Sequence, residues 1–399
     1  MAAGLSASQR TQYAAALDLL AGKLLEDEAR IGIAFPYVTL PSGDWDLMPA
    51  SVSAGYGARG WSHGNWFCGF WVGLHVAAAL HTGNDAHFGL ARERMRLVAQ
   101  RADDPNTHDI GFIFESSALR LLHAAGDESQ AAIAMTAAER LRARTIVTER
   151  GAYLSSWGPL DDARARAASA IDTMTNLPLL YWAAEYSGDA SFLLAAEAHA
   201  KMTRLGMVRD DWSTYHAVEY DTRTGARARG YTFQGYADES HWSRGQGWAV
   251  LGFAATAAAT GNAAYLDIAA HLFDAYERRL GGNPIPAWDF DDPRGAAAPR
   301  DSSAGAVMAN ALLRMADLAP DVACAERWRD LALAMLDALC REALATDPRH
   351  RGLLRHGVYS MPQGIGTDSA VLFGDYFFTT ALMRALHPGA FVPVDARLA

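Results

Sequence analysis

Several stretches of this sequence are apolar at nearly every position and rich in Ala and Leu, a composition typical of helices. The clearest examples are residues 70–80, 177–186, 247–259 and 303–316. A helix that is apolar on all sides has to be covered on all sides. The pattern therefore predicts central helices that are surrounded by other helices.

Four of the helical stretches end at a Gly that is followed directly by Asp or Asn. These glycines are Gly83, Gly126, Gly188 and Gly261, and they are 43, 62 and 73 residues apart. Gly closes a helix in the left-handed conformation, and the Asp or Asn after it caps the next helix. Looser versions occur at Pro320 and Pro388. The 399 residues thus accommodate about six helical hairpins of unequal length.

Two arrangements of such hairpins are open, a stacked solenoid and a closed double ring. The helices that are apolar all round favour the ring, an all-α (α/α)6 barrel. No linker rich in Pro, Gly or Ser divides the chain, so we expect one catalytic domain over residues 1–399. One short β-hairpin is predicted from residues 215–220 and 230–236, with a turn at 221–225.

Charge and cysteine content narrow the function further. The chain has 35 basic and 45 acidic residues, a net charge of −10, which argues against nucleic acid as a partner. Neither of its two lysines, Lys23 and Lys201, lies in a P-loop. Cys68, Cys324 and Cys340 have apolar neighbours and are expected to be buried, reduced thiols. With no signal peptide and no membrane-spanning run, we expect a cytoplasmic protein without membrane contact, of open oligomeric state.

Polar and aromatic residues recur at nearly the same distance, which we call their phase, before the residue that closes each hairpin. Trp66, Asp109 and Arg244 each precede the closing Gly of their hairpin by 17 residues, Asp172 does so by 16, and Asp301 precedes Pro320 by 19. In a ring of hairpins, equal phase places side chains at the same mouth. The helix N-termini also point their positive ends there, which suits an anionic ligand.

Any one of these aspartates taken alone could simply cap a helix. Asp109, however, stands among apolar neighbours. Asp172 is followed by Thr175 and Asn176, either of which is expected to cap the helix that has Pro178 in its first turn. Asp109 and Asp172 are therefore the candidate catalytic carboxylates.

Tryptophans crowd the same loops. A single Trp usually packs in the core, but a series of them beside carboxylates is typical of a cleft that stacks sugar rings. Two carboxylates in such a cleft indicate glycoside hydrolysis, since apolar walls and a neighbouring carboxylate raise the pKa of the acid. The tryptophans concerned are Trp61, Trp66, Trp71, Trp157, Trp242, Trp248 and Trp288.

Two residues are candidate holders of an anionic group. Arg244 could grip a carboxylate with two donors, or form a structural ion pair. His216 could bind the anion, or be a core histidine. No HExxH motif indicates a zinc site, and we expect no metal.

Ordered motifs of this chain resemble the unsaturated glucuronyl hydrolases, glycoside hydrolase family 88. They include Asn65 to Trp71 (NWFCGFW), His108 to Phe112 (HDIGF), Ile171 to Leu177 (IDTMTNL), Ser213 to His216 (STYH), Trp242 to Trp248 (WSRGQGW) and Gly374 to Phe378 (GDYFF). The resemblance implies an (α/α)6 barrel that removes 4,5-unsaturated glucuronate from the non-reducing end of lyase-generated oligosaccharides. It implies hydration of the C4=C5 double bond, without a metal or an organic cofactor.

The resemblance also implies a role for each matching residue. Asp172 would be the general acid and then the base for water, and Asp109 the second catalytic carboxylate. The substrate would be bound by Trp66, Trp157, His216, Gln234, Trp242, Arg244 and Trp248.

The chain departs from the family pattern at two places. Phe233 stands where family members often have His, and residues 360–366 differ, with no Lys after Lys201. The resemblance therefore implies unsulfated or weakly sulfated substrates, unless Arg355 substitutes for the missing Lys. Two alternatives stay open: an unsaturated rhamnogalacturonyl hydrolase on the same barrel, which should lack the STYH and WSRGQ blocks, and a non-catalytic glycan-binding toroid, which would not need both aspartates.

Overall fold

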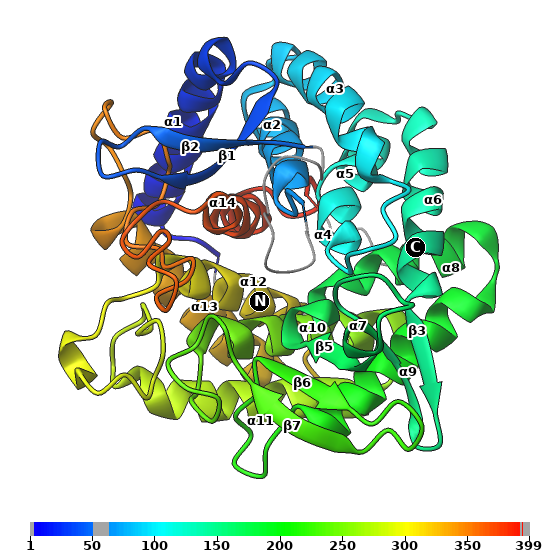
Figure 1. The fold of residues 1–399 in the computed structure, drawn as a ribbon. Helices are drawn as coiled ribbons and strands as arrows, with labels where there is room; N and C mark the ends of the chain where they lie inside the picture. The colour runs from blue at the N-terminus through cyan, green and yellow to red at the C-terminus, as the bar shows by residue number, and fades with distance from the viewer. Residues whose placement is uncertain (1–3, 51–63, 392, 394–399) are drawn as a thin grey trace.

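A computed structural model describes residues 4–50, 64–391 and 393, and its helices form two concentric rings (Figure 1). The inner ring consists of α2 (Cys68–Thr82), α4 (Ile110–Glu115) with α5 (Ala118–Ala125), the 3-10 helix η2 (Ile171–Asn176) with α8 (Pro178–Ser187), α10 (Ser243–Thr260), α12 (Ser302–Asp317) and α14 (Leu372–Leu386). Each inner helix packs against the next, and α14 packs against α2. This last contact closes the ring and excludes an open solenoid.

The outer ring alternates with the inner one along the chain. It consists of α1 (Ala7–Ile31), α3 (Ala86–Val98), α6 (Ser129–Ala143), α9 (Ala190–Gly206), α11 (Ala263–Leu280) and α13 (Val322–Glu342). Shorter helical segments are η1 (Ala99–Arg101), α7 (Ala163–Ala167) and η3 (Gly295–Ala297). The predicted (α/α)6 barrel is confirmed.

Burial explains the apolar pattern of the inner helices. Every residue of α12 from Ser302 to Ala316 is buried, because α10, α13 and α14 cover it from different sides. The outer helix α11 buries one face only, at Tyr265, Leu266, Ala269, Leu272, Phe273, Ala275 and Tyr276. This spacing of three to four residues is the stripe of a helix that faces a core on one side.

The glycines that end the helices also have the predicted left-handed conformation. Gly83, Gly126, Gly188 and Gly261 have φ angles of 68°, 60°, 73° and 68° and end α2, α5, α8 and α10. The side chain of Asn262 accepts a hydrogen bond from the backbone N–H of Ala264 and so caps α11. In these four hairpins, one left-handed Gly therefore separates the inner helix from the outer helix that follows it.

Short antiparallel strands lie between the helices along the chain. They are β1 (Ala34–Thr39) with β2 (Trp45–Pro49), β3 (Thr145–Thr148) with β4 (Gly151–Leu154), and the sheet β5–β6–β7 (Ala168–Ala170, Ala217–Tyr220, Arg227–Tyr231). The predicted hairpin is present as β6–β7, in which Ala217 pairs with Tyr231. Its second strand was placed too late in the sequence, since it covers 227–231 and not 230–236. The third strand, β5, pairs with β6 and leads directly into η2, which carries Asp172.

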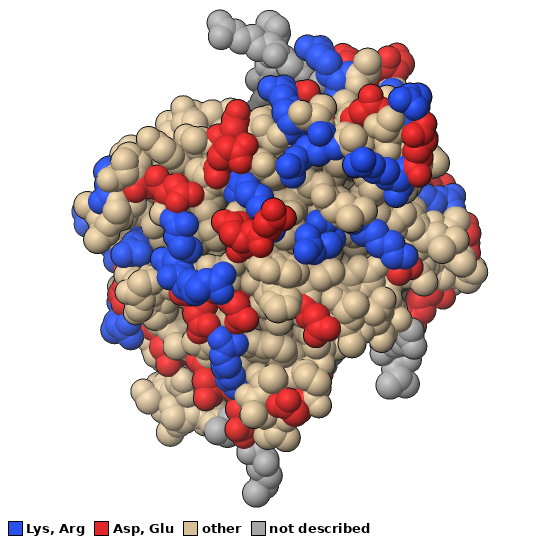
Figure 2. Space-filling model, turned by 90° about the horizontal axis from the view of Figure 1, so that it is seen from below, with Lys and Arg blue, Asp and Glu red and all other residues tan. Residues whose placement is uncertain are grey.

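The cysteines and the surface bear on the remaining expectations. Cys68 and Cys340 are buried free thiols, whereas Cys324 is partly exposed, since it lies in the first turn of the outer helix α13. None of the described helices combines the length and apolar character that crossing a bilayer requires. On the face shown in Figure 2, basic and acidic side chains intermingle without forming one large patch of either sign.

Candidate active site

Four of the five in-phase residues, Trp66, Asp109, Asp172 and Arg244, line one cavity at a mouth of the barrel. The fifth, Asp301, is buried beside Arg244 and caps α12, so the capping alternative holds for it. Asp109 directly precedes α4, Asp172 lies in η2, and Arg244 lies in the first turn of α10. They share a narrow cavity of about 50 Å³. Its lining is Trp66, His108, Asp109, Trp157, Asp172, Phe233, Gln234, Arg244, Trp248 and Tyr359. This set includes every predicted site residue except His216 and Trp242.

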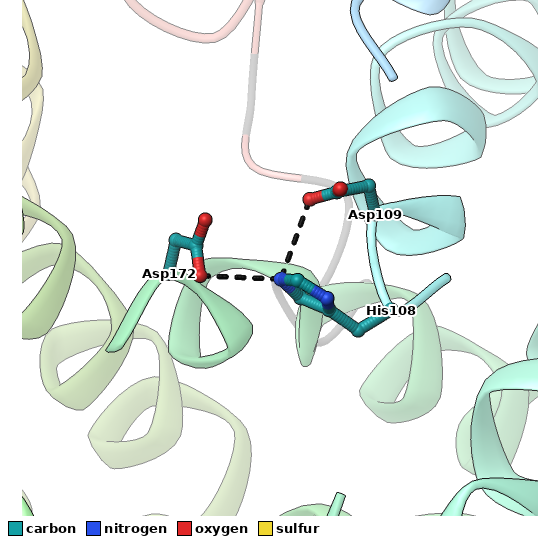
Figure 3. Close-up of side chains that lie close together, drawn as sticks. All are labelled: His108, Asp109 and Asp172. Atoms are coloured by element: carbon teal, nitrogen blue, oxygen red, sulfur yellow. Dashed lines mark hydrogen bonds and ion pairs between the residues drawn. The ribbon is translucent and has the colours of Figure 1, made fainter. Parts of the chain in front are cut away.

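The two aspartates approach each other through His108 (Figure 3). The Nε2 atom of His108 is 3.1 Å from Oδ1 of Asp172 and 3.4 Å from Oδ1 of Asp109. The side chain of Asp172 is 24% exposed, and that of Asp109 is 8% exposed. The pair therefore faces one cavity, as the sequence predicts, and Asp172 is the more accessible acid.

Local hydrogen bonds fix His108 and Asp109. Nδ1 of His108 donates to the carbonyl oxygen of Ser156 at 2.5 Å, which turns Nε2 toward the aspartates. Oδ2 of Asp109 accepts from the hydroxyl of Thr107 at 3.1 Å, and the side chain caps no helix. The capping alternative for Asp109 therefore does not apply.

The segment that carries Asp172 is fixed by its own side chains. Thr175 Oγ1 and Asn176 Nδ2 donate to the carbonyl oxygen of Asp172 at 2.7 and 3.1 Å. Asn176 Oδ1 also accepts from the backbone N–H of Phe112 at 2.6 Å, which ties η2 to α4. The expectation that Thr175 or Asn176 caps α8 is wrong, because the N-cap position is Leu177 and both side chains bond elsewhere.

Mutual charge and burial set the protonation of this cluster. Burial lowers the pKa of His108, but the carboxylates of Asp109 and Asp172 raise it by more, to about 9. Burial raises the pKa of Asp109, His108 opposes this, Asp172 adds to it, and the result is about 6. Burial also acts to raise the pKa of Asp172, but the charge and hydrogen bond of His108 leave it below its usual value. The raised pKa thus belongs to Asp109.

The same three side chains have the donor types of a metal site. One donor atom from each of His108, Asp109 and Asp172 lies within 4.8 Å of the others. However, Nε2 of His108 lies within hydrogen-bonding or ion-pair distance of both carboxylates, and a proton on this atom accounts for the arrangement. The expectation of a metal-free site remains a prediction.

Arg244 lies at the site, but both of its terminal nitrogens are engaged within the protein. It therefore does not present two free N–H donors to a carboxylate. Its Nη1 donates to Asp301 at 2.8 Å and to the carbonyl oxygen of Val358. Its Nη2 donates to the carbonyl oxygen of Tyr359 at 2.7 Å and to Oε1 of Gln234 at 3.2 Å. The alternative of a structural ion pair is thus realised, while the buried guanidinium still places a positive charge beside the cavity.

His216 and Trp242 form the layer behind the cavity wall. The ring of His216 lies 4.2 Å from that of Phe233 and 4.4 Å from that of Trp242. Its Nδ1 is 2.9 Å from the hydroxyl of Thr232. Burial lowers the pKa of His216 to about 3, so the ring is neutral and does not supply a positive charge.

The tryptophans divide between the cavity and the core. Trp66 lines the cavity, with its ring 5.6 Å from Phe112 and its Nε1 3.3 Å from the hydroxyl of Tyr359. Trp71 is instead buried between helices, where its Nε1 donates to Glu28 at 2.6 Å. Trp288 is also buried, and its Nε1 donates to Asp292. Placing Trp71 and Trp288 at the mouth is therefore wrong, and Trp61 lies outside the described residues.

Three residues of the cavity are absent from the predicted set: His108, Phe233 and Tyr359. Phe233 packs edge-on against Trp157, with ring centroids 5.4 Å apart. The position of His108 directly before Asp109 was the available signal for its role. The place of Tyr359 depends on a loop that returns to the mouth from the far end of the sequence, and no local pattern marks it.

Comparison with known proteins gives relatives over most of the chain. It is 35% identical over 327 residues to an unsaturated glucuronyl hydrolase of Bacillus sp. (strain GL1), covering 80% of this chain and 86% of that protein. It is 30% identical over 325 residues to an unsaturated chondroitin disaccharide hydrolase of Streptococcus pneumoniae (strain ATCC BAA-255 / R6), covering 80% and 81%. No protein-family model matches the chain.

Solved structures agree with these relatives. The crystal structure of the unsaturated glucuronyl hydrolase from Bacillus sp. GL1 matches with a TM-score of 0.87 at 31% identity, over 96% of this chain and 99% of that one. A UGL variant described with dGlcA-Glc-Rha-Glc matches equally well, with a TM-score of 0.87.

A closed double ring of helices with two acids among aromatic rings at its mouth, taken with these relatives, defines the protein as a glycosidase. Its likeness to the Bacillus enzyme extends through the sequence and the whole barrel. The chain belongs to the unsaturated glucuronyl hydrolase family, glycoside hydrolase family 88.

Proposed function

We propose that this protein removes 4,5-unsaturated glucuronic acid from the non-reducing end of glycosaminoglycan-type disaccharides that lyases generate. The observation that carries the proposal is the pair of aspartates bridged by His108 in an aromatic-lined cavity. The names of the relatives, which include glucuronyl and chondroitin disaccharide hydrolases, support the same substrate class.

In the proposed reaction Asp172 is the acid and then the base. Its protonated carboxyl gives a proton to C4 of the alkene, and the cation that develops at C5 is stabilised by the carboxylate of Asp109. Water adds at C5 and returns a proton to Asp172. The hemiketal formed at C5 then opens and releases the neighbouring sugar. The greater exposure of Asp172 supports its assignment as the residue that meets substrate.

The spacing of the acids argues against the water-admitting geometry of an inverting glycosidase. Donor atoms of Asp109 and Asp172 lie within 4.8 Å of each other, whereas an inverting glycosidase separates its carboxyl groups by roughly 6.5–9.5 Å to admit water. His108 also contacts both acids through one atom, Nε2, with a hydrogen bond to Asp172 and an ion-pair contact to Asp109. The two carboxyl groups therefore act together on C4 and C5, the two atoms of the substrate's double bond.

The cavity also bears on the binding of the uronate and on sulfation. Arg244 and the helix N-termini supply positive potential for the uronate carboxylate, and Trp66, Trp157 and Trp248 supply apolar walls. The loop at residues 360–366 contains no Lys, and its Ser360 hydroxyl is directed to the carbonyl oxygen of Phe233 at 3.3 Å. Arg355 does not line the cavity. We therefore propose a preference for unsulfated or weakly sulfated disaccharides.

The test follows the ultraviolet absorbance of the C4=C5 double bond in a panel of lyase-generated disaccharides. Loss of absorbance with unsulfated glucuronyl disaccharides, slower loss with sulfated ones and no effect of a chelator are expected. Loss only with unsaturated rhamnogalacturonan fragments would instead identify the sister activity. Unchanged absorbance with every substrate would refute the proposal and favour a glycan-binding toroid.

Two further expectations belong with this proposal. We propose that residues 1–399 act as one catalytic domain, since the ring closes only when α14 meets α2. We also propose a cytoplasmic location, in keeping with three free cysteines. Fractionation of the native cells with an antibody to the protein tests this location.

A further inference from the structure

We propose that His108 is the positioning residue that stores, on Nε2, the proton that Asp172 delivers. Before each turnover, His108 transfers this proton to Asp172. This inference deepens the proposed function and rests on it. It is carried by the geometry of one ring between two acids, with Nε2 3.1 Å from Asp172 and 3.4 Å from Asp109.

The orientation of the ring requires a proton between these groups. Because Nδ1 donates to the carbonyl oxygen of Ser156, one ring proton is fixed on Nδ1. If Nε2 had no proton and both acids were ionised, a lone pair would face two negatively charged oxygens. The cluster is consistent with its contacts only when it holds one further proton, on Nε2 or on one of the carboxyl groups.

The surroundings keep that proton within the cluster. The titratable groups that face His108 are Asp109, Asp172 of η2 and His199 of α9. Burial lowers the pKa of His199 to about 3, and its Nδ1 accepts from the backbone N–H of Leu154, so this residue stays neutral. Among the neighbouring arginines, the charges of Arg101 and Arg144 interact with Asp109. Neither arginine competes for the proton on Nε2, because an arginine remains protonated.

The proton transfers among His108, Asp172 and the substrate with its attacking water balance. The imidazolium of His108 gives its Nε2 proton to Oδ1 of Asp172, which leaves a neutral imidazole and a carboxylic acid. Asp172 then gives this proton to C4, where the electron pair of the double bond forms the new C–H bond. Water bonds to C5 and loses a proton to the Asp172 carboxylate. That proton returns to Nε2, and the net change is the addition of one water molecule.

The directions of the pKa shifts agree with this order. The pKa of His108 is raised to about 9, while that of Asp172 is lowered, so in the free protein near neutral pH the proton rests on His108. An acid with a low pKa in the free enzyme needs a nearby proton donor once the bound substrate has displaced water from the site. His108 is the donor within reach.

Two substitutions separate proton storage from hydrogen bonding. His108→Gln keeps a neutral N–H near the position of Nε2, and His108→Asn keeps one near the position of Nδ1, facing Ser156. We expect kcat to fall at least about 10-fold in both. We also expect the basic limb of the kcat/KM–pH profile of His108→Gln to move down by more than one pH unit, with a smaller change in KM. His271→Gln, at an exposed position on α11, should keep the wild-type profile.

A purely structural role predicts a different result. In that case His108→Gln would retain activity through its hydrogen bond, and the pH limbs would stay in place. Either observation overturns the proposal.

A second measurement does not depend on turnover. The ring nitrogen shifts of 15N-labelled histidine in the free protein, assigned through His108→Gln, should show both nitrogens of His108 protonated at pH 7. Asp172→Asn should lower the pKa of His108 by more than one unit. A neutral His108 at pH 7 would refute the inference, even if the protein hydrolysed its substrate. Protonation of His108 in a protein that acts on no unsaturated disaccharide would refute the proposed function alone.

Discussion

Arg244 and Asp301 form an ion pair with 2.8 Å between Nη1 and Oδ2, and neither side chain is more than 2% exposed. Oδ1 of Asp301 also accepts from the backbone N–H groups of Ser303 and Val358. The pair therefore joins the N-terminal ends of α10 and α12 to the loop that carries Tyr359. It holds one wall of the catalytic cavity in place.

Arg244→Ala should weaken both folding and substrate binding. The change leaves Asp301 buried without its partner, and loss of one member of a buried pair costs about 3–5 kcal/mol. We expect chemical denaturation to show a loss of this order, and kinetics to show a raised KM and a reduced kcat/KM. Combining it with Asp301→Asn should recover part of the stability but not the KM. Unchanged stability would show that the pair is not a structural element.

Asp172→Asn should abolish turnover while leaving the fold intact. The side chain reaches the cavity and caps no helix, so the change removes the proton donor at little structural cost. A fall of at least about 100-fold in kcat is expected, with the thermal unfolding midpoint close to that of the wild type. Near-normal activity would mean that another residue is the acid.

The barrel was predictable because its signals are local. Whole inner helices are apolar, and a left-handed glycine ends each of four of them, so a short window contains the information. The hairpins β1–β2 and β3–β4 were not predicted. Their strands are short and gain their stability from packing against helices that lie elsewhere in the sequence.

The site was predictable where residue type and phase coincide, as at Asp109 and Asp172. Sequence could not show how those residues are bonded. His108 is oriented by Ser156, 48 residues later, and Arg244 is engaged by the carbonyl oxygens of Val358 and Tyr359, more than 100 residues later. Long-range backbone contacts of this kind leave no pattern in the sequence.

Gly111→Ala should impair catalysis by separating the two aspartates. A Cβ at Gly111 would lie 2.5 Å from the Cβ and the carbonyl oxygen of Asn176, so α4 would have to move away from η2. We expect a loss of stability of about 1–3 kcal/mol and a larger relative loss of kcat than of substrate affinity. The control is Gly89→Ala in α3, where the added Cβ meets open space and should stabilise the protein by up to about 1 kcal/mol. Equal kinetic effects of the two changes would contradict this account.

Glu28 should make the stability of the barrel depend on pH in acid. Its carboxylate accepts from Trp71 at 2.6 Å and from Arg94 at 2.6 Å, which joins α1 to α2 and α3. Burial raises the pKa of Glu28, but hydrogen bonds from His75, Arg94 and Trp71 lower it by more, from 4.5 to about 2. Because the pKa is lower in the folded state, the stabilisation is complete above the unfolded pKa and is lost as the pH falls toward 2.

The test is chemical denaturation at a series of pH values from 7 to 2. A fall in pKa of this size corresponds to about 3 kcal/mol, and the wild type should lose this amount between about pH 5 and pH 2. Glu28→Gln should be less stable at pH 7 and should lack that part of the acid-induced loss. Glu93→Gln, at an exposed position on α3, should retain it. If Glu28→Gln and the wild type lose stability in parallel as the pH falls, the Glu28 carboxylate does not link these three helices energetically.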